Sequence, residues 1–196
     1  MLTYLREHHL DANLASLNYR LSPAVKHPSH EDDVIAALNY LKQEYGMKTY
    51  VLVGHSAGAC LAFQSHDSVS GCKGIIGVEG IYDLTELVDE YPEYRYFVEE
   101  AFGKDKSVWQ EASPTFRVHQ RPLISDLTIQ CVQSLEDDLL SPRQTETMFR
   151  VLSETKVNLK EIAWIRGTHD ISITTPTFHN LVYNFIIKLT QNDNQI

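Results

Sequence analysis

The G-H-S-A-G motif at residues 54–58 restricts the fold of this chain more than any other part of it. It follows the apolar, β-branched run at residues 50–53 and precedes residues 59–64, which contain no helix breaker. A G-x-S-x-G motif between a strand and a helix forces its serine into a sharp, strained turn that exposes the hydroxyl. We expect the two glycines and Ala57 to permit this turn because they are small. Ser56 is therefore the candidate nucleophile.

A serine hydroxyl needs a histidine to take its proton and a carboxylate to hold that histidine. On this kind of turn the acid and the histidine follow the serine in that order along the chain. The strand-forming residues 127–132 run into a polar turn that carries Glu136, Asp137 and Asp138. We predict Asp137 as the acid. Asp138 and Glu136 stay open as alternatives, because sequence does not resolve the register of a loop to one residue.

The candidate base is His169, which follows the predicted strand at residues 159–165 and the turn residue Gly167. Its place after the last predicted strand separates it from the other histidines of the chain. His55, inside the motif, is predicted to be a packing and orienting residue. Because no H-x-E-x-H or C-x-x-C pattern accompanies the histidines, we predict no metal site.

The composition indicates one domain over residues 1–196, since 43% hydrophobic residues can bury a sizeable core and no linker or repeat interrupts the chain. The formal net charge of -9 argues against nucleic-acid binding. No stretch has the length of a membrane span, and the first residues lack the apolar core of a signal peptide. The cysteines Cys60, Cys72 and Cys131 are predicted to be free thiols, which favours a cytoplasmic location.

Strand and helix patterns alternate along the chain, which is typical of an α/β fold with a mostly parallel sheet flanked by helices. The predicted strands cover residues 14–19, 50–53, 74–78, 127–132 and 159–165. One helix is predicted to begin at Ser29 as its N-cap and to end at Gly46, another to follow Ser56, and a third to cover residues 143–152.

Residues 82–122 contain no strand pattern and form a candidate cap over the serine. This segment is rich in aromatic residues, among them Tyr82, Tyr91, Tyr94, Tyr96, Phe97, Phe102 and Trp109. Such rings either stack on an aromatic substrate or pack the cap onto the body of the domain, and packing is the commoner role of a single ring.

Several motifs resemble the kynurenine formamidase (arylformamidase) branch of the α/β-hydrolases. Those at residues 18–23, 33–38 and 54–58 carry the resemblance to the branch. Those at residues 79–84, 87, 90–94, 101–102, 137–140 and 143–145 resemble fungal members more than general esterases. The resemblance covers nearly the whole chain. It implies an α/β-hydrolase fold, with Ser56 as nucleophile, Asp137 as acid and His169 as base, and it suggests a homodimer.

The resemblance implies hydrolysis of N-formyl-L-kynurenine to L-kynurenine and formate, a step of tryptophan breakdown that needs no cofactor. The backbone N–H of Ala57, which follows the nucleophile, is predicted to donate to the oxyanion. Two alternative interpretations stay open: the chain is a general short-acyl carboxylesterase, or it is a non-catalytic remnant of a hydrolase.

The chain departs from the family at the oxyanion loop. The family carries an H-G-G-x-W segment there, whereas this chain has no adjacent glycines and has tryptophan only at positions 109 and 164. We therefore expect it to be truncated at its N-terminus relative to the family, without the first strands and this loop. The absent strand would lie between residues 14–19 and the strand of the motif, so backbone groups on both would lack partners and few oxyanion donors would remain.

Overall fold

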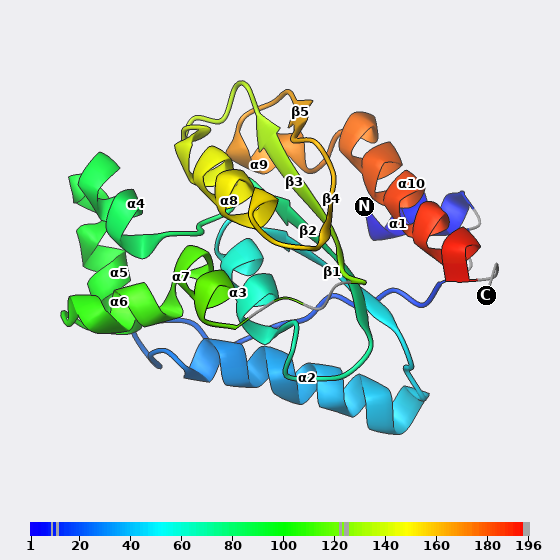
Figure 1. Cartoon of the computed structure of the whole chain (residues 1–196), viewed down its shortest axis with the longest axis horizontal. Helices are drawn as coiled ribbons and strands as arrows, with labels where there is room; N and C mark the ends of the chain where they lie inside the picture. The colour runs from blue at the N-terminus through cyan, green and yellow to red at the C-terminus, as the bar shows by residue number, and fades with distance from the viewer. Residues whose placement is uncertain (9, 11, 122, 124–125, 194–196) are drawn as a thin grey trace.

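The computed structural model describes residues 1–8, 10, 12–121, 123 and 126–193. Its centre is a five-stranded sheet in which every pairing is parallel (Figure 1). The strands are β1 (Tyr50–His55), β2 (Cys72–Val78), β3 (Thr128–Ser134), β4 (Asn158–Leu159) and β5 (Ala163–Ile165). Their order is β1-β2-β3-β4, with β5 also beside β3. The predicted α/β class with a parallel sheet is confirmed.

Helices and one 3-10 turn account for the other regular elements of the described residues. They are α1 (Leu2–Glu7), α2 (Ser29–Tyr45), α3 (Ala57–Ser65), α4 (Leu84–Glu90), η1 (Pro92–Tyr94), α5 (Arg95–Phe102), α6 (Lys106–Ala112), α7 (Pro114–Gln120), α8 (Arg143–Ser153), α9 (His169–Ser172) and α10 (Pro176–Asp193). Helix α2 begins at Ser29 as expected, but Pro28 rather than Ser29 is its N-cap, and no side chain caps it. It ends at Gly46, whose φ of 65° is left-handed.

Helices cover both faces of the sheet. Residues of α2, α3, α7 and α8 pack with one face, and residues of α1 and α10 pack with the other. Successive residues of a strand point to opposite faces. In β2, Ile75 therefore joins the first core and Ile76 the second, and both are fully buried. This double burial explains why the strands read as nearly continuous apolar runs.

The predicted strand at residues 159–165 is broken into β4 and β5. Ile129 faces Leu159, and Val132 faces Ala163. Three residues of the outer strand, 160–162, thus lie opposite two residues of β3. The extra residue interrupts the ladder as a bulge does. Beyond the break, β5 continues toward His169.

The predicted strand at residues 14–19 is wrong, because residues 13–20 have no regular secondary structure. Leu14 and Leu17 are half-buried against the two cores, as is Tyr19. The apolar residues are thus placed as in a strand, but a strand also needs a neighbour for its backbone hydrogen bonds. Within the described residues, β1 is an edge strand with β2 as its one sheet partner.

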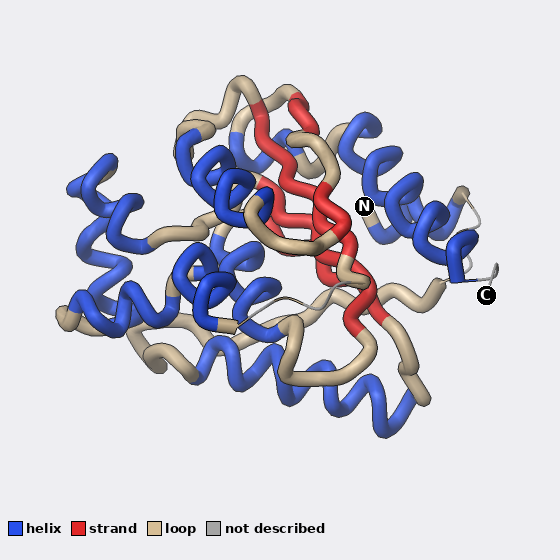
Figure 2. The backbone as a smooth tube through the Cα atoms, in the orientation of Figure 1, coloured by secondary structure: helices blue, strands red, loops and turns tan. Residues whose placement is uncertain are grey.

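Residues 82–121 form a helical layer beside the sheet (Figure 2). As predicted, they contain no strand; Pro122, the last residue of the candidate cap, lies outside the described residues. Residues of α4, α5 and α6 share a separate apolar core. Trp109 and Tyr82 are buried, at 1% and 0% exposure, so these two rings pack inside the protein, whereas Tyr96 is 67% exposed.

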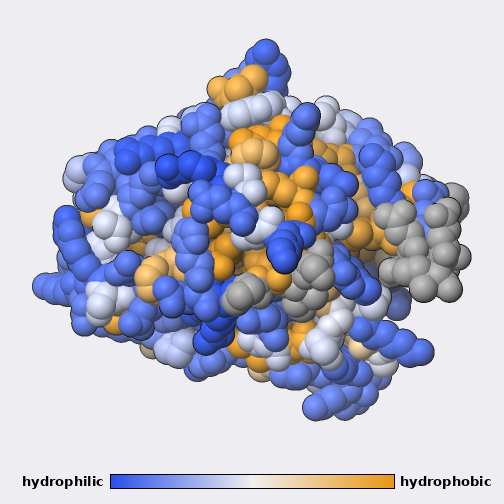
Figure 3. Space-filling view, viewed as in Figure 1, coloured by the Kyte–Doolittle hydropathy of each residue, from blue (hydrophilic) through white to orange (hydrophobic). Residues whose placement is uncertain are grey.

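The surface seen in Figure 3 is mostly polar, with apolar residues gathered in its middle, where Figure 1 shows β3 and β4. Cys60, Cys72 and Cys131 are buried and free, as predicted. Within the part of the chain that the structure describes, no helix combines the length and the apolar character needed to cross a bilayer.

Candidate active site

Ser56 lies between β1 and α3 in a strained backbone conformation, with φ of 55° and ψ of -121°. Its N–H donates to Val78 O at 2.9 Å, and its carbonyl oxygen accepts from Ala59 N at 3.0 Å and from Ile81 N at 3.3 Å. A non-glycine residue in such a conformation persists only where its surroundings fix it. These three bonds fix the turn and leave the Ser56 side chain half-buried at the end of the sheet.

The two glycines of the motif differ in the space that a side chain would find at their positions. A Cβ at Gly54 would overlap the backbone carbonyl of Gly58, so the close approach of β1 and α3 requires glycine at position 54. A Cβ at Gly58 would meet nothing within 4 Å. The expectation that both glycines are needed for the turn is therefore wrong for Gly58, whose space is open.

Ala57 is the first residue of α3 and is exposed. The first N–H groups of a helix have no acceptor within the helix. The Ala57 N–H therefore lies at a helix N-terminus beside Ser56, where the helix dipole favours negative charge. This is the arrangement that an oxyanion donor requires.

His169 and Asp137 are brought together from distant parts of the chain. His169 begins α9, and its Nδ1 lies 3.1 Å from Asp137 Oδ1 and 3.0 Å from Oδ2. Their side chains are only 5% and 1% exposed. Because an ionised carboxylate can only accept, Nδ1 carries the proton and donates it, which leaves Nε2 as the acceptor.

The two alternative acids also hold the loop of His169, but by other contacts. Asp138 Oδ1 accepts the backbone N–H of His169 at 3.0 Å. Glu136 pairs with Arg166 at 2.7 Å and accepts the Gly167 N–H at 3.0 Å. Asp137 is thus the one of the three acids whose carboxylate contacts the imidazole ring.

Burial lowers the pKa of His169, but the hydrogen bond to Asp137 and the negative charges of Asp137, Glu79 and Asp170 outweigh it. The pKa of His169 is therefore raised above its usual 6.5. Burial also raises the pKa of Asp137, but the hydrogen bonds from His169 and from the N–H groups of residues 139 and 140 hold it below its usual 3.8. Both shifts favour the pair in which Asp137 is ionised and His169 is protonated.

His55 and Glu79 complete the cluster around His169. The ring centroids of His55 and His169 are 4.4 Å apart, and His55 Nε2 lies 3.1 Å from Glu79 Oε2. His55 thus packs against the candidate base, as its predicted role requires. Sequence reasoning did not place Glu79 in the site. The available signal was a charged residue directly after the apolar strand β2, since the carboxyl ends of parallel strands gather at one edge.

No hydrogen bond joins the Ser56 hydroxyl to His169 within the described part of the chain. The two residues are linked instead by His55, which precedes Ser56 and contacts the His169 ring. Catalytic hydrogen bonds of this kind are often long in the absence of substrate and tighten in its complex.

His55, Glu79 and His169 each offer one metal-ligand atom, and these atoms lie within 4.8 Å of one another. Two imidazoles and a carboxylate form a ligand set that zinc accepts. The hydrogen bond between His55 and Glu79 and the packing of the His55 ring on the His169 ring account for their closeness, however. A metal ion bound through His169 Nδ1 would displace the bond to Asp137.

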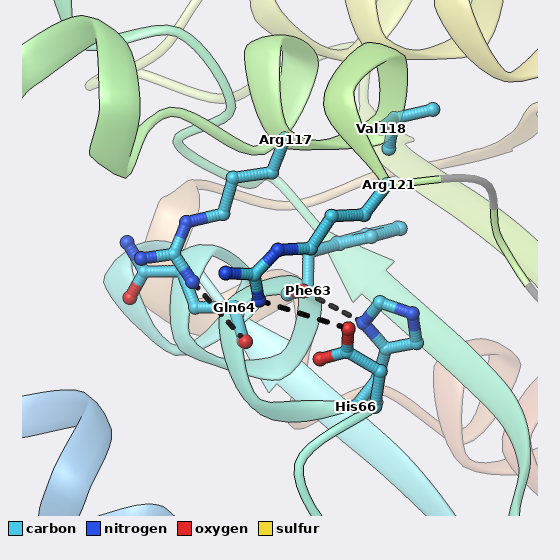
Figure 4. Close-up of a pocket in the computed structure, with 7 residues that line it drawn as sticks. Phe63, Gln64, His66, Arg117, Val118 and Arg121 are labelled. Atoms are coloured by element: carbon cyan, nitrogen blue, oxygen red, sulfur yellow. Dashed lines mark hydrogen bonds and ion pairs between the residues drawn. The ribbon is translucent and has the colours of Figure 1, made fainter.

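A small pocket between α3 and α7 is separate from this site (Figure 4). Its arginines already have partners: Arg117 is paired with Glu31 at 2.7 Å, and Arg121 lies 3.9 Å from Asp67. Arg117 also donates to the carbonyl oxygen of Gln64 at 3.2 Å. Both arginines of the pocket are therefore paired, and the contacts of Arg117 tie α7 to α2 and α3.

Comparison with known sequences places the chain among hydrolases. A family model described as the alpha/beta hydrolase fold matches residues 7–172. The kynurenine formamidase of Meyerozyma guilliermondii is 39% identical over 171 residues, 81% of this chain and 66% of that protein. The kynurenine formamidase of Eremothecium gossypii is 31% identical over 183 residues, 82% of this chain and 74% of that protein. The chain thus spans about two thirds of the length of the first of these relatives.

Solved structures show the same fold at low sequence identity. Esterase B from Lactobacillus rhamnosus has a TM-score of 0.74 at 16% identity, over 91% of this chain and 65% of that one. A truncated carbohydrate esterase from gut microbiota has a TM-score of 0.72 at 16% identity, over 90% and 73%. From the family match, the sequence relatives and this shared architecture, the chain belongs to the α/β-hydrolase fold family and, within it, to the kynurenine formamidase family.

Proposed function

We propose that this chain hydrolyses N-formyl-L-kynurenine to L-kynurenine and formate through Ser56, Asp137 and His169. The observation that carries the proposal is the 39% identity to a kynurenine formamidase, in a chain whose Asp137 carboxylate is hydrogen-bonded to His169. The strained backbone of Ser56 supports its role as the nucleophile.

In the first half of the reaction, Ser56 Oγ attacks the formyl carbon and His169 Nε2 takes the hydroxyl proton. The charge that develops on the formyl oxygen is stabilised by the N–H of Ala57. The tetrahedral intermediate then collapses. The bond from carbon to the aryl nitrogen breaks, His169 returns the proton to that nitrogen, and L-kynurenine leaves.

In the second half, water attacks the formyl ester on Ser56 while His169 takes a proton from the water. The ester bond breaks, the proton returns to Ser56 Oγ, and formate leaves. Asp137 accepts the hydrogen bond from His169 Nδ1–H throughout and stabilises the imidazolium that forms in each half. The sequence of steps needs no cofactor.

The cap, the location and the assembly belong to the same proposal. Residues 82–122 act as a cap, which two contacts with the loop after Asp137 support: Tyr94 Oη donates to Leu139 O at 3.0 Å, and Ser141 N donates to Tyr91 Oη at 2.8 Å. Three buried free cysteines support a cytoplasmic location. The homodimer rests on the family resemblance alone.

The test compares kcat/KM for N-formyl-L-kynurenine with kcat/KM for p-nitrophenyl acetate on the purified chain, with Ser56→Ala as the blank. We expect N-formyl-L-kynurenine to be the better substrate and Ser56→Ala to be inactive on both. Hydrolysis of the acetate ester alone would contradict the proposal and indicate a general carboxylesterase. Activity on neither substrate would indicate a non-catalytic hydrolase fold.

A further inference from the structure

Glu79 follows β2 and is fully buried, with 0% of its surface exposed. A carboxylate in such a place is costly unless other groups satisfy it. Its Oε1 has no hydrogen-bond partner among the described residues. A buried acid that is only partly satisfied calls for an explanation beyond packing.

The other oxygen of Glu79 joins three elements of the fold. Glu79 Oε2 accepts from His55 Nε2 of β1 at 3.1 Å and from Ser172 Oγ of α9 at 2.9 Å. Ser172 Oγ also lies 3.2 Å from the carbonyl oxygen of His169. A single carboxylate oxygen thus holds the residue before Ser56 and the short helix that begins with His169.

The backbone of Glu79 is strained as well. Its φ of 46° lies in the left-handed region, which residues other than glycine rarely adopt. Its N–H donates to Val132 O at 2.8 Å, which extends the pairing of β2 with β3 by one residue. Strain of this kind concentrates at functional sites. In this protein it aims the carboxylate at the two histidines.

Glu79 also acts on His169 through its charge, because Oε2 lies 3.7 Å from His169 Nδ1. The charged and titratable groups facing His169 are Asp137 of the loop after β3, Glu79 after β2, His55 of β1 and Asp170 of α9. Asp138 contacts the His169 backbone. Asp137 is therefore not the single anion beside the ring.

We propose that Glu79 is a positioning residue for the proposed reaction, a second carboxylate that fixes His55 against the His169 ring, holds α9 through Ser172, and stabilises the imidazolium formed in each half of the cycle. This role rests on the proposed function of Ser56 and His169. It differs from the role of Asp137, since Glu79 reaches the base mainly through His55 and Ser172.

The test is the pH dependence of the rate at which a fluorophosphonate labels Ser56 in wild type and Glu79→Gln. Labelling needs neutral His169. Removing the negative charge lowers the pKa of His169, so we expect the acid limb of the profile to move to lower pH. We also expect the plateau rate to fall about 10- to 100-fold, the range for one lost hydrogen bond to a charged group. Glu79→Asp, which keeps the charge, should retain the wild-type acid limb.

A matched control is Glu31→Gln, because Glu31 is also buried but pairs with Arg117, away from the site. We expect this variant to lower Tm and to leave the acid limb in place. An NMR titration of the His169 ring in wild type and Glu79→Gln measures the same shift without any reaction. The titration therefore tests the role of Glu79 independently of the proposed function, which fails if N-formyl-L-kynurenine is not hydrolysed.

The proposal is overturned if folded Glu79→Gln keeps the wild-type His169 titration and labelling profile. If Glu79→Gln does not fold, Ser172→Ala decides, because it removes one of the two donors to Oε2 without a change of charge. Slower labelling of Ser56 in Ser172→Ala at an unchanged acid limb supports the role. An unchanged rate in that variant overturns it.

Discussion

The ring of His55 packs against the ring of His169 with their centroids 4.4 Å apart. His55 precedes Ser56, whereas His169 lies more than a hundred residues further along the chain. This contact links the turn of the candidate nucleophile directly to the candidate base. Substitutions near Ser56 and substitutions near His169 should therefore affect the same reaction.

Ser56→Ala should abolish labelling of the chain by a fluorophosphonate, because the probe reacts with an activated serine hydroxyl. The measurement is gel fluorescence or intact mass after labelling at neutral pH, with heat-unfolded wild type as the blank. Continued labelling of Ser56→Ala at another serine would show that the nucleophile is assigned to the wrong residue.

Asp137→Asn should lower kcat by about 10⁴, since an amide does not enforce the histidine tautomer that the reaction needs. Asp138→Asn is the matched neighbour. It loses only an acceptor for the His169 backbone N–H and should have a mild effect. Steady-state kinetics of both variants decide between the two acids. A larger loss in Asp138→Asn would reverse the assignment.

Gly54→Ala should destabilise the fold by about 1 to 3 kcal/mol or more, because its Cβ would overlap the backbone carbonyl of Gly58. Gly58→Ala is the control at the other end of the motif. Its Cβ meets open space inside a helix, so it should be neutral or stabilising by up to about 1 kcal/mol. Thermal unfolding measures both, and equal Tm values for the two variants would contradict this account.

The acid limb of kcat/KM should have its midpoint above the ordinary histidine pKa of 6.5, because His169 must be neutral to take the proton and its pKa is raised. Activity should therefore rise with pH through that raised value. Stability has the opposite sign: the contribution of protonated His169 is complete below its unfolded pKa and is lost as pH rises through the folded one. A kinetic midpoint at or below 6.5 would contradict the geometry of the Asp137 pair.

The parts of the fold that follow from local pattern could be predicted from sequence. The turn at Ser56 needs only a strand that ends in Gly54 and a helix that follows the serine directly. The chain order of Asp137 and His169 needs only the ends of two later strands. These features depend on residues close together in the sequence.

The parts that depend on pairing could not be predicted. Residues 14–19 carry a strand pattern, but whether they pair depends on what lies beside them. The break between β4 and β5 arises from one extra residue opposite β3, which appears only when the register is known. Local pattern places Glu79 at the carboxyl end of β2, but its place beside His55 and His169 depends on the position of β2 between β1 and β3.

The place of β1 at the edge of the described sheet has a consequence for amide exchange. Tyr50 N donates to Gly71 O and Ser56 N donates to Val78 O, so the even-numbered amides of β1 point toward β2. The amides of Val51 and Val53 point the other way. Hydrogen–deuterium exchange should therefore alternate along the strand, slow at Leu52 and Gly54 and fast at Val51 and Val53. Ser56, the candidate nucleophile, would then directly follow a strand whose backbone is hydrogen-bonded along one side.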